Sequence, residues 1–396
     1  CVISEKELEG QTNSYIKVKS SLQALKDMAL LYRNNLDIKV VGITGSVGKT
    51  STKETISYVL NKKYKVLKTE GNFNNEIGLP LTVFRLRDDD EVAVLEMGIS
   101  DFGEMDRLSK IAQPDISVIT NIGLCHLENL KTRDGILKAK TEIFNNMKPD
   151  GIAILNGDDD KLITVDEVNG KKPERFGINY KDGVYAKDIE NLGLSGTKFV
   201  ISGLNCVDGC KDFEVTVPVP GHHMIYNALA AACVGAALEL TSAQIADGIA
   251  DLKTISGRNN IIKTSKYTLI DDCYNANPVS MKASVDVLDM AIGRKVCILG
   301  NMYELGEDEK NLHYDVGQYI GTKNIDVLIT IGDLARHIAM GTDDYMETHF
   351  GSYDCEIHSF DDMEEFNMAY SSILKDNDNI LIKASHAMKF ADIVEL

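Results

Sequence analysis

The stretch GITGSVGKTSTKE, residues 42–54, decides the fold of this chain. A β-branched run, KVVGIT (39–44), leads into a glycine turn, and a helix-forming segment follows from Lys49 to Leu60. A glycine turn between a strand and a helix points backbone N–H groups and the positive end of the helix dipole at a phosphate. Gly-Lys-Thr at such a junction therefore predicts a nucleotide-binding loop.

The loop departs from the usual pattern G-x-x-x-x-G-K-[ST]. That pattern asks for a glycine where this chain has Ile43, and this chain has glycines at Gly42 and Gly45 instead. We interpret the difference as a variant loop class. Lys49 is expected to neutralise the β- and γ-phosphates of a nucleotide. The hydroxyl of Thr50 suits Mg²⁺, which prefers oxygen ligands.

The overall charge excludes two classes of partner. The chain has 396 residues, of which 42 are basic and 60 acidic, giving a net charge of −18. Nucleic acids and anionic membranes both require basic surface, so neither is expected as a partner. No apolar run reaches the roughly 18 residues that span a bilayer. The eight cysteines have no regular spacing, which favours isolated thiols in a reducing compartment.

Apolar, β-rich runs alternate with segments of helical periodicity. Eight runs predict strands: KVVGIT (39–44), EVAVLEMG (91–98), ISVITNIG (116–123), GIAILNG (151–157), YTLIDD (267–272), KVCILGN (295–301), DVLITIG (326–332) and NILIKAS (379–385). Strands that are apolar on both faces and alternate with helices form parallel sheets. We predict an α/β fold with a central P-loop ATPase domain, a small β insertion over 160–220 and a C-terminal Rossmann-like domain.

The predicted domain boundaries follow from this pattern. An N-terminal segment covers 1–37, the ATP-binding domain 38–253 and the C-terminal domain 254–396, with a join and hinge near LKTISGRNN (252–260). Two helices are predicted from apolar faces, which are formed by Leu22, Leu25, Ala29 and Tyr32 in the first and by Met281, Val285, Leu288 and Ile292 in the second. The N-terminal segment is too short for a domain of its own.

Several stretches together resemble one enzyme family. They are TGSVGKTS (44–51), GNFNNEIGLPLT (71–82), LEMG (95–98), TNIGLCHLE (120–128), KAKTEIF (138–144), GHHMIYNALAA (221–231) and DDCYNANPVSM (271–281). In this order they resemble the Mur ligases, the ATP-dependent amino-acid ligases of peptidoglycan synthesis. The last stretch, with LGNMYELGE (299–307), is similar to the member that adds D-alanyl-D-alanine to UDP-N-acetylmuramoyl-tripeptide.

The resemblance implies a reaction, its partners and a location. ATP and Mg²⁺ would activate the tripeptide carboxyl as an acyl phosphate, which the amine of D-alanyl-D-alanine then attacks. The implied protein is a cytoplasmic bacterial enzyme, expected as a monomer. Full-length family members carry a separate N-terminal domain for the UDP-sugar, and we expect this chain to lack most of it. The third residue of the tripeptide, lysine or a diamino acid, stays open.

The resemblance also assigns residues to the reacting end of the site. Glu96 and His126 follow strand ends, and they would hold Mg²⁺ together with Thr50. A lysine in KAKTEIF would be carbamylated by CO₂ and would contribute to a second metal site. Lys140 fits the family position better than Lys138. The catalytic set implied by the resemblance is Lys49, His126, Lys140 and Arg258.

Other residues are assigned to the two substrates. The implied ATP site comprises Thr44, Gly45, Ser46, Val47, Gly48, Lys49, Thr50, Ser51, His223, Asn227 and Asp272. The implied peptide-binding residues are Asn72, Asn75, Tyr274, Asn275, Asn277 and His386. A helix-capping turn would also explain Asn277. His386 stands where the family commonly has an arginine, so the dipeptide carboxylate would be held more weakly or in a pH-dependent way.

Two other interpretations stay open. One is another ligase of the same build, such as a folylpolyglutamate synthase, against which DDCYNANP (271–278) argues. The other is a nucleotide-binding fragment with little ligase activity. The presence of Lys49, Glu96 and Lys140 argues against the second.

Overall fold

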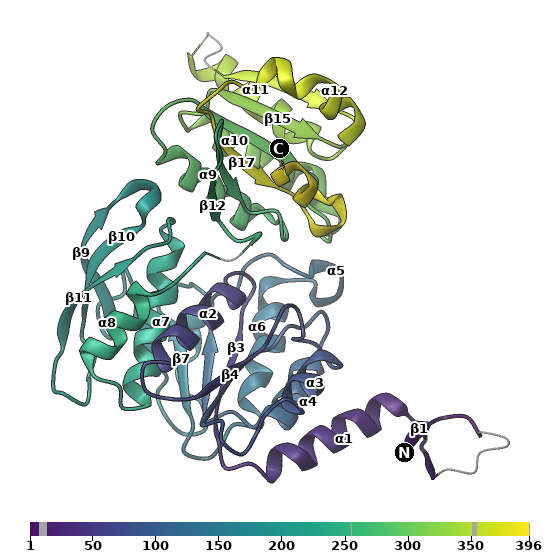
Figure 1. The fold of residues 1–396 in the computed structure, drawn as a ribbon, viewed down its shortest axis with the longest axis vertical. Helices are drawn as coiled ribbons and strands as arrows, with labels where there is room; N and C mark the ends of the chain where they lie inside the picture. Colours follow the sequence, from purple (N-terminus) through teal and green to yellow (C-terminus); the bar gives the residue numbers. More distant parts are fainter. Residues whose placement is uncertain (8–13, 255, 351–354, 396) are drawn as a thin grey trace.

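Two β-sheets, each covered by helices on both faces, make up most of the molecule (Figure 1). The computed structural model describes residues 1–7, 14–254, 256–350 and 355–395. In Figure 1 the second sheet with its helices lies above the first, and the N-terminal helix α1 projects at the lower right. The predicted α/β fold with mostly parallel sheets is confirmed.

The first sheet has nine strands in the order β11-β10-β9-β8-β7-β6-β3-β5-β4. All neighbours pair in parallel except β9–β10 and β10–β11, which are antiparallel. The strands are β3 (Lys39–Thr44), β4 (Val66–Lys68), β5 (Val92–Glu96), β6 (Ile116–Ile119), β7 (Ile152–Asn156), β8 (Glu174–Gly177), β9 (Val184–Asn191), β10 (Thr197–Ser202) and β11 (Asp212–Val217). The expected β insertion therefore extends this sheet as β8–β11.

Helices cover both faces of the first sheet because its strands are apolar on both sides. One face packs against α2 (Lys49–Leu60), α7 (His223–Ala237) and α8 (Ser242–Ala250). The other packs against α1 (Ser21–Asn34), α3 (Gly78–Val83), α4 (Glu104–Ala112) and α6 (Arg133–Thr141). The short α5 (Leu127–Leu130) follows β6. The first sheet is thus the centre of a three-layer unit.

The central strand β3 has β6 on one side and β5 on the other. The chain winds in opposite directions from β3, so the carboxyl end of this strand is the switch point where α/β sheets bind ligands. The predicted phosphate loop lies at this point.

The second sheet has six strands in the order β12-β13-β17-β14-β15-β16, with only β12 antiparallel to its neighbour. They are β12 (Asn260–Lys263), β13 (Thr268–Asp271), β14 (Lys295–Gly300), β15 (Val327–Ile331), β16 (Glu356–Phe360) and β17 (Asn379–Lys383). The helices around it are α9 (Pro278–Asp289), α10 (Glu309–Gly321), α11 (Arg336–Phe350) and α12 (Met363–Ile373). Short 3-10 turns include His386–Met388 and Phe390–Glu395.

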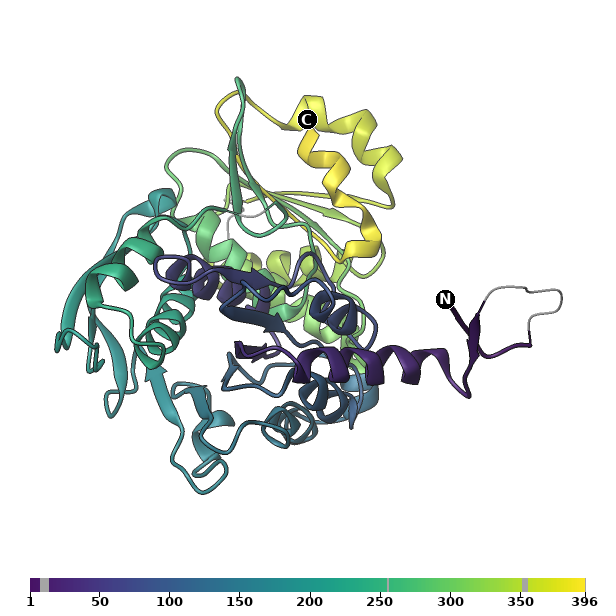
Figure 2. The same ribbon diagram turned by 60° about the horizontal axis from the view of Figure 1, so that its bottom comes forward.

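The N-terminal segment contributes a small parallel pair, β1 (Val2–Ser4) with β2 (Tyr15–Lys17), and then α1. Both views place β1 away from the β9–β11 end of the molecule (Figures 1 and 2). The face predicted for α1 is partly wrong, since Leu22 is exposed and the buried positions are Lys26, Ala29 and Arg33. The guanidinium of Arg33 donates to three backbone carbonyls, which explains how a basic side chain is buried here.

The second predicted helical face also needs one correction. Met281, Val285 and Leu288 are buried on α9, but the helix ends at Asp289 and Ile292 is 97% exposed. The predicted domain join near 252–260 includes residue 255, which lies outside the described residues. We keep 38–253 and 254–396 as a proposed division, with 1–37 as a proposed separate segment.

Candidate active site

The phosphate loop joins β3 to α2 in the predicted manner, and α2 begins at Lys49. Gly48 caps the helix with a φ of 82°, in the left-handed region that favours glycine. A side chain at Gly45 would place its Cβ 1.9 Å from Thr120 Oγ1. Both glycines are therefore required by the local geometry. Ile43, at the position of the missing glycine, is a buried strand residue.

The segment that follows β6 holds the loop in place through hydrogen bonds. The Val47 N–H donates to Asn121 Oδ1 at 2.9 Å, and Asn121 Nδ2 donates back to the Val47 carbonyl at 2.9 Å. Ser46 Oγ donates to the Gly123 carbonyl at 3.2 Å. No role was predicted for Asn121 from the sequence. The sequence signal for a role in the site was the position of this asparagine just after a predicted strand.

Glu96, at the end of β5, contacts the loop threonine Thr50. Thr50 Oγ1 donates to Glu96 Oε2 at 2.9 Å, and Asn74 Nδ2 donates to Glu96 Oε1 at 2.9 Å. The buried ammonium of Lys53 lies 4.0 Å from Glu96 Oε2 and donates to the Thr69 carbonyl at 2.7 Å. Glu96 is thus held in place from three sides. Lys53 was not predicted as a site residue, because the side chain of a lysine inside a helix is usually exposed to solvent.

The asparagines of GNFNNE (71–76) divide into different roles. Asn74 contacts Glu96, whereas Asn75 Oδ1 accepts from the backbone N–H groups of Ile77 and Gly78 at the start of α3. Asn72 is exposed, and the structure gives its side chain no hydrogen bond to a described residue. Of the two asparagines assigned to the peptide, neither touches Glu96.

Lys140 is a buried lysine on α6 and is 1% exposed. Within the described part of the chain, its ammonium group makes no hydrogen bond or ion pair with any residue. Burial, and secondarily the charge of Lys49, lowers the Lys140 pKa from 10.5 to about 8. Lys138, the competing assignment, is exposed, with its ammonium 5.9 Å from the Phe102 ring centroid.

His126 lies near the same cations. It precedes α5 in a left-handed conformation with a φ of 50°. Burial, with the charges of Lys140 and Lys49, lowers the His126 pKa to about 4. The imidazole is therefore neutral near pH 7. Its Nδ1 lies 3.5 Å from Glu304 Oε2 on the second sheet's side of the cleft.

Mg²⁺ fits the residues around the loop. Thr50 and Glu96 supply hard oxygen donors next to the phosphate position, and His126 is neutral. Among described residues, no group of three or more His, Cys, Asp or Glu side chains could enclose a metal ion. The oxygen donors of Thr50 and Glu96 suit Mg²⁺, which usually keeps several waters and binds substrate phosphates.

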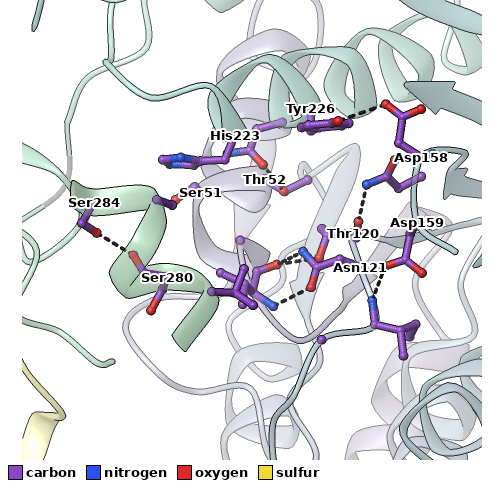
Figure 3. Close-up of a pocket in the computed structure, with 18 of the residues that line it drawn as sticks. Ser51, Thr52, Thr120, Asn121, Asp158, Asp159, His223, Tyr226, Ser280 and Ser284 are labelled. Atoms are coloured by element: carbon purple, nitrogen blue, oxygen red, sulfur yellow. Dashed lines mark hydrogen bonds between the residues drawn. The ribbon is translucent and has the colours of Figure 1, made fainter. Parts of the chain in front are cut away.

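A cavity of about 580 Å³ lies between the two sheets, beside the loop. Figure 3 shows Ser51, Thr52 and His223 on one side of it and Ser280 and Ser284 of α9 on the other. His223 and Asn227 both line the cavity, as their i, i+4 spacing on α7 predicted. Thr52 Oγ1 donates to Asn227 Oδ1 at 2.9 Å, and burial lowers the pKa of His223.

The second sheet contributes a buried ion pair to the cavity wall. Lys383 Nζ donates to Asp272 Oδ2 at 2.5 Å and to the Asn275 carbonyl at 3.0 Å. Asp272 Oδ2 also accepts from the Ser284 hydroxyl. Asp272 was predicted from the sequence, but Lys383 was not, because an isolated lysine at a strand end carries no distinctive signal.

Three predicted residues lie together at the edge of this sheet. The Arg258 guanidinium carbon lies 4.0 Å from the Tyr274 ring centroid, and the Tyr274 and His386 ring centroids are 5.6 Å apart. Asn277 caps α9 through its Oδ1, which the helix-capping interpretation predicted, while Asn275 Oδ1 accepts from the Ala276 N–H. The structure therefore brings Arg258, Tyr274 and His386 together and gives Asn277 a structural contact.

Comparison with known proteins shows the family to which the chain belongs. Residues 43–235 match the Mur ligase middle domain, and residues 257–386 match the Mur ligase glutamate ligase domain. The UDP-N-acetylmuramoyl-tripeptide–D-alanyl-D-alanine ligase of Bacillus subtilis (strain 168) is 37% identical over 388 residues, which cover 97% of this chain and 81% of that protein. The chain belongs to the Mur ligase family. The ligase of the same name from Escherichia coli (strain K12) is 35% identical over 81% of this chain and 71% of its own length.

Solved structures of other Mur ligases have the same overall fold as this chain. MurF from Acinetobacter baumannii superimposes with a TM-score of 0.89 at 30% identity, covering 99% of this chain and 83% of that one. MurF from Thermotoga maritima, in complex with ADP, gives a TM-score of 0.85 at 30% identity, covering 99% and 87%. The described part of the chain contains no helix with the length and apolarity to cross a membrane.

Proposed function

We propose that this Mur ligase joins D-alanyl-D-alanine to the C-terminal carboxyl of UDP-N-acetylmuramoyl-tripeptide, with hydrolysis of ATP to ADP and phosphate. The observation that carries the proposal is that the charge of Lys49 acts on the buried Lys140 while the adjacent Thr50 contacts Glu96. Lys140 has no hydrogen-bond or ion-pair partner among the described residues. The names of the relatives from Bacillus subtilis and Escherichia coli support the choice of substrates. The sequence stretch DDCYNANP (271–278) supports it over a folylpolyglutamate synthase.

The reaction has two steps. A carboxylate oxygen of the tripeptide attacks the γ-phosphorus of ATP, and ADP leaves with the electron pair of the broken P–O bond. The amine of the dipeptide then attacks the acyl carbon, a C–N bond forms, and inorganic phosphate departs. Of the two protons lost by the ammonium group, one is carried by the phosphate and one goes to water.

The chain's contribution is to position the substrates and to stabilise charge. Lys49 is proposed to turn from the Gly45 carbonyl, which it contacts at 2.8 Å, to the transferring phosphoryl group. Arg258 lies in the cavity wall and is proposed to approach the same group from the second sheet. Thr50, Glu96 and His126 would hold Mg²⁺, which supplies charge neutralisation at the phosphates when bound.

Lys140 is proposed to carry a carbamate. Its neutral amine would attack CO₂, forming an N–C bond and releasing one proton, and the resulting anion would contribute oxygen ligands. Lys140 is buried and has no hydrogen-bond or ion-pair partner in the described part of the chain, so its amine is available, and the lowered pKa raises its neutral fraction.

The proposed cofactors, substrate positions and location rest on the family comparison and on the residues that line the cavity. ATP and Mg²⁺ are the proposed cofactors, with the ribose and base in the cavity beside His223 and Asn227. The dipeptide is proposed to lie near Tyr274, Asn275 and His386. We place the enzyme in the bacterial cytoplasm.

A coupled phosphate-release assay tests the function. With ATP, tripeptide substrate and dipeptide all present, phosphate should appear at the rate of amide formation. Omission of either peptide should abolish steady release. Release that is unchanged without D-alanyl-D-alanine would show a different reaction. A glutamate-dependent reaction with a folate substrate would favour the other ligase class.

A further inference from the structure

The loop after β14 presents one carboxylate across the interdomain cleft. Met302 and Leu305 are buried in the core of the second sheet, so the chain between them is held against its surface. The side chain of Glu304, between these anchors, is 71% exposed. Its Oε2 lies 3.5 Å from Nδ1 of His126, which belongs to the first sheet's side of the cleft. The loop therefore aims Glu304 at the reacting end of the site.

The backbone at Glu304 is in an unfavourable conformation for this residue type. Its φ is 64°, in the left-handed region that a non-glycine residue adopts only at an energetic cost. Gly306, with a φ of 75°, would take such a conformation without that cost. Together with the contact to His126, this conformation supports a functional role for Glu304.

The neighbouring loop is fixed to this one by Tyr303. The Tyr303 N–H donates to Ser385 Oγ at 2.9 Å, and its hydroxyl lies 3.1 Å from Met388 Sδ. Ser385 and Met388 flank His386, which was proposed above for the dipeptide carboxylate. β14 and β17 are adjacent strands, so Glu304 and His386 stand on adjacent loops at the same sheet edge.

The incoming dipeptide is a zwitterion, with an ammonium group at one end and a carboxylate at the other. The acyl phosphate side of the cleft requires cations such as Lys49 to stabilise the phosphate, and these repel an ammonium group. An opposing carboxylate would offset that repulsion and orient the nucleophile. We propose that Glu304 binds the amino group of the incoming dipeptide and directs it toward the acyl phosphate. This inference rests on the proposed function.

The test compares Glu304→Gln with the matched control Glu307→Gln. Glu307 is exposed on the same loop, so its substitution removes a charge of equal sign without facing His126. Glu304→Gln should raise the KM for D-alanyl-D-alanine at least tenfold. It should leave the KM for ATP, the KM for the tripeptide substrate and the Mg²⁺ requirement within twofold. Glu307→Gln should change none of them.

A reaction with a second nucleophile distinguishes weaker dipeptide binding from damage to the residues that form the acyl phosphate. Hydroxylamine is uncharged at pH 8, so hydroxamate formation from the acyl phosphate should proceed in Glu304→Gln at the parent rate. Glu304→Asp should recover part of the lost dipeptide affinity.

Three results would overturn the inference. The first is that the parent chain is active and Glu304→Gln has a KM for D-alanyl-D-alanine within twofold of the parent value. The second is that Glu304→Gln changes only the Mg²⁺ requirement. The third is loss of the hydroxylamine reaction together with the dipeptide reaction. A parent chain that releases no phosphate with all three substrates contradicts the proposed function, and the inference falls with it.

Discussion

Lys140 in the first domain and Lys383 in the second are both almost completely buried, yet their surroundings differ. Lys383, 2% exposed, donates to Asp272 and to the Asn275 carbonyl. Lys140, 1% exposed, has no hydrogen-bond or ion-pair partner among the described residues. A buried charge is normally tolerated only when it is paired. We infer from this difference that Lys140 is kept for reactivity and Lys383 for structure.

The largest expected effect is on catalysis through the first lysine. Lys140→Ala should reduce amide formation more than 100-fold, equivalent to about 2.7 kcal/mol in barrier, because the carbamate can no longer form. Added short carboxylic acids should restore part of the activity. The matched control is Lys138→Ala, at the exposed neighbouring lysine, which should stay within twofold. Equal losses in the two variants would remove the basis for choosing Lys140.

Lys49→Ala extends the test to the loop. The transferring phosphoryl group would lose its charge partner, so ATP-dependent amide formation should fall more than tenfold, or ~1.4 kcal/mol in barrier. Steady-state rates at saturating ATP measure this directly. A variant that keeps activity within tenfold of the parent would contradict the assignment of Lys49.

Substitution of the second lysine should mainly affect stability. Lys383→Met leaves the Asp272 carboxylate buried without its cation, which typically costs about 3–5 kcal/mol. Equilibrium urea unfolding, followed by circular dichroism, should show this loss in free energy. A Lys383→Met protein as stable as the parent would mean that the buried pair is not a structural requirement.

Lys140→Met should have the opposite effect on stability, and the effect should depend on pH. The folded-state pKa of Lys140 is lowered to about 8, below its unfolded value, so the unfolded chain binds the proton more tightly. Below pH 8 the buried ammonium destabilises the fold, and stability should recover as pH rises from about 8 toward 10.5. In bicarbonate-free buffer at pH 7, Lys140→Met should therefore be more stable than the parent by on the order of 1–3 kcal/mol.

Urea unfolding at pH 7 and pH 9.5 measures this difference. The gain from Lys140→Met should shrink at the higher pH. A gain that is independent of pH would show that the titration of Lys140 does not contribute to it.

Much of the fold was predictable because it rests on local patterns. The strand from Lys39 to Thr44 and the helix from Lys49 to Leu60 were predicted to the residue, since a β-branched run and a glycine turn set both ends. The side-chain environments were less accessible. Lys140 and Lys138 are two positions apart in one helix, and only tertiary packing distinguishes the buried lysine from the exposed one.

Errors and omissions arose where polar groups are satisfied by distant backbone. Arg33 is buried on α1 because carbonyls from other segments accept its hydrogen bonds, which helical periodicity cannot foresee. Lys383 meets Asp272 only when β17 and β13 pair. Among the asparagines of 71–76, the turn geometry selects Asn74 for Glu96, and the sequence offered no basis for that choice.

The most direct test of the difference between the two lysines is detection of the carbamate by ¹³C NMR in ¹³C-labelled bicarbonate. The parent protein and Lys138→Ala should show a protein-bound carbamate signal that increases as the pH is raised through about 8, where the Lys140 amine loses its proton. The signal should be absent from Lys140→Ala. A parent protein without any carbamate signal, or a signal that survives in Lys140→Ala, would contradict the account.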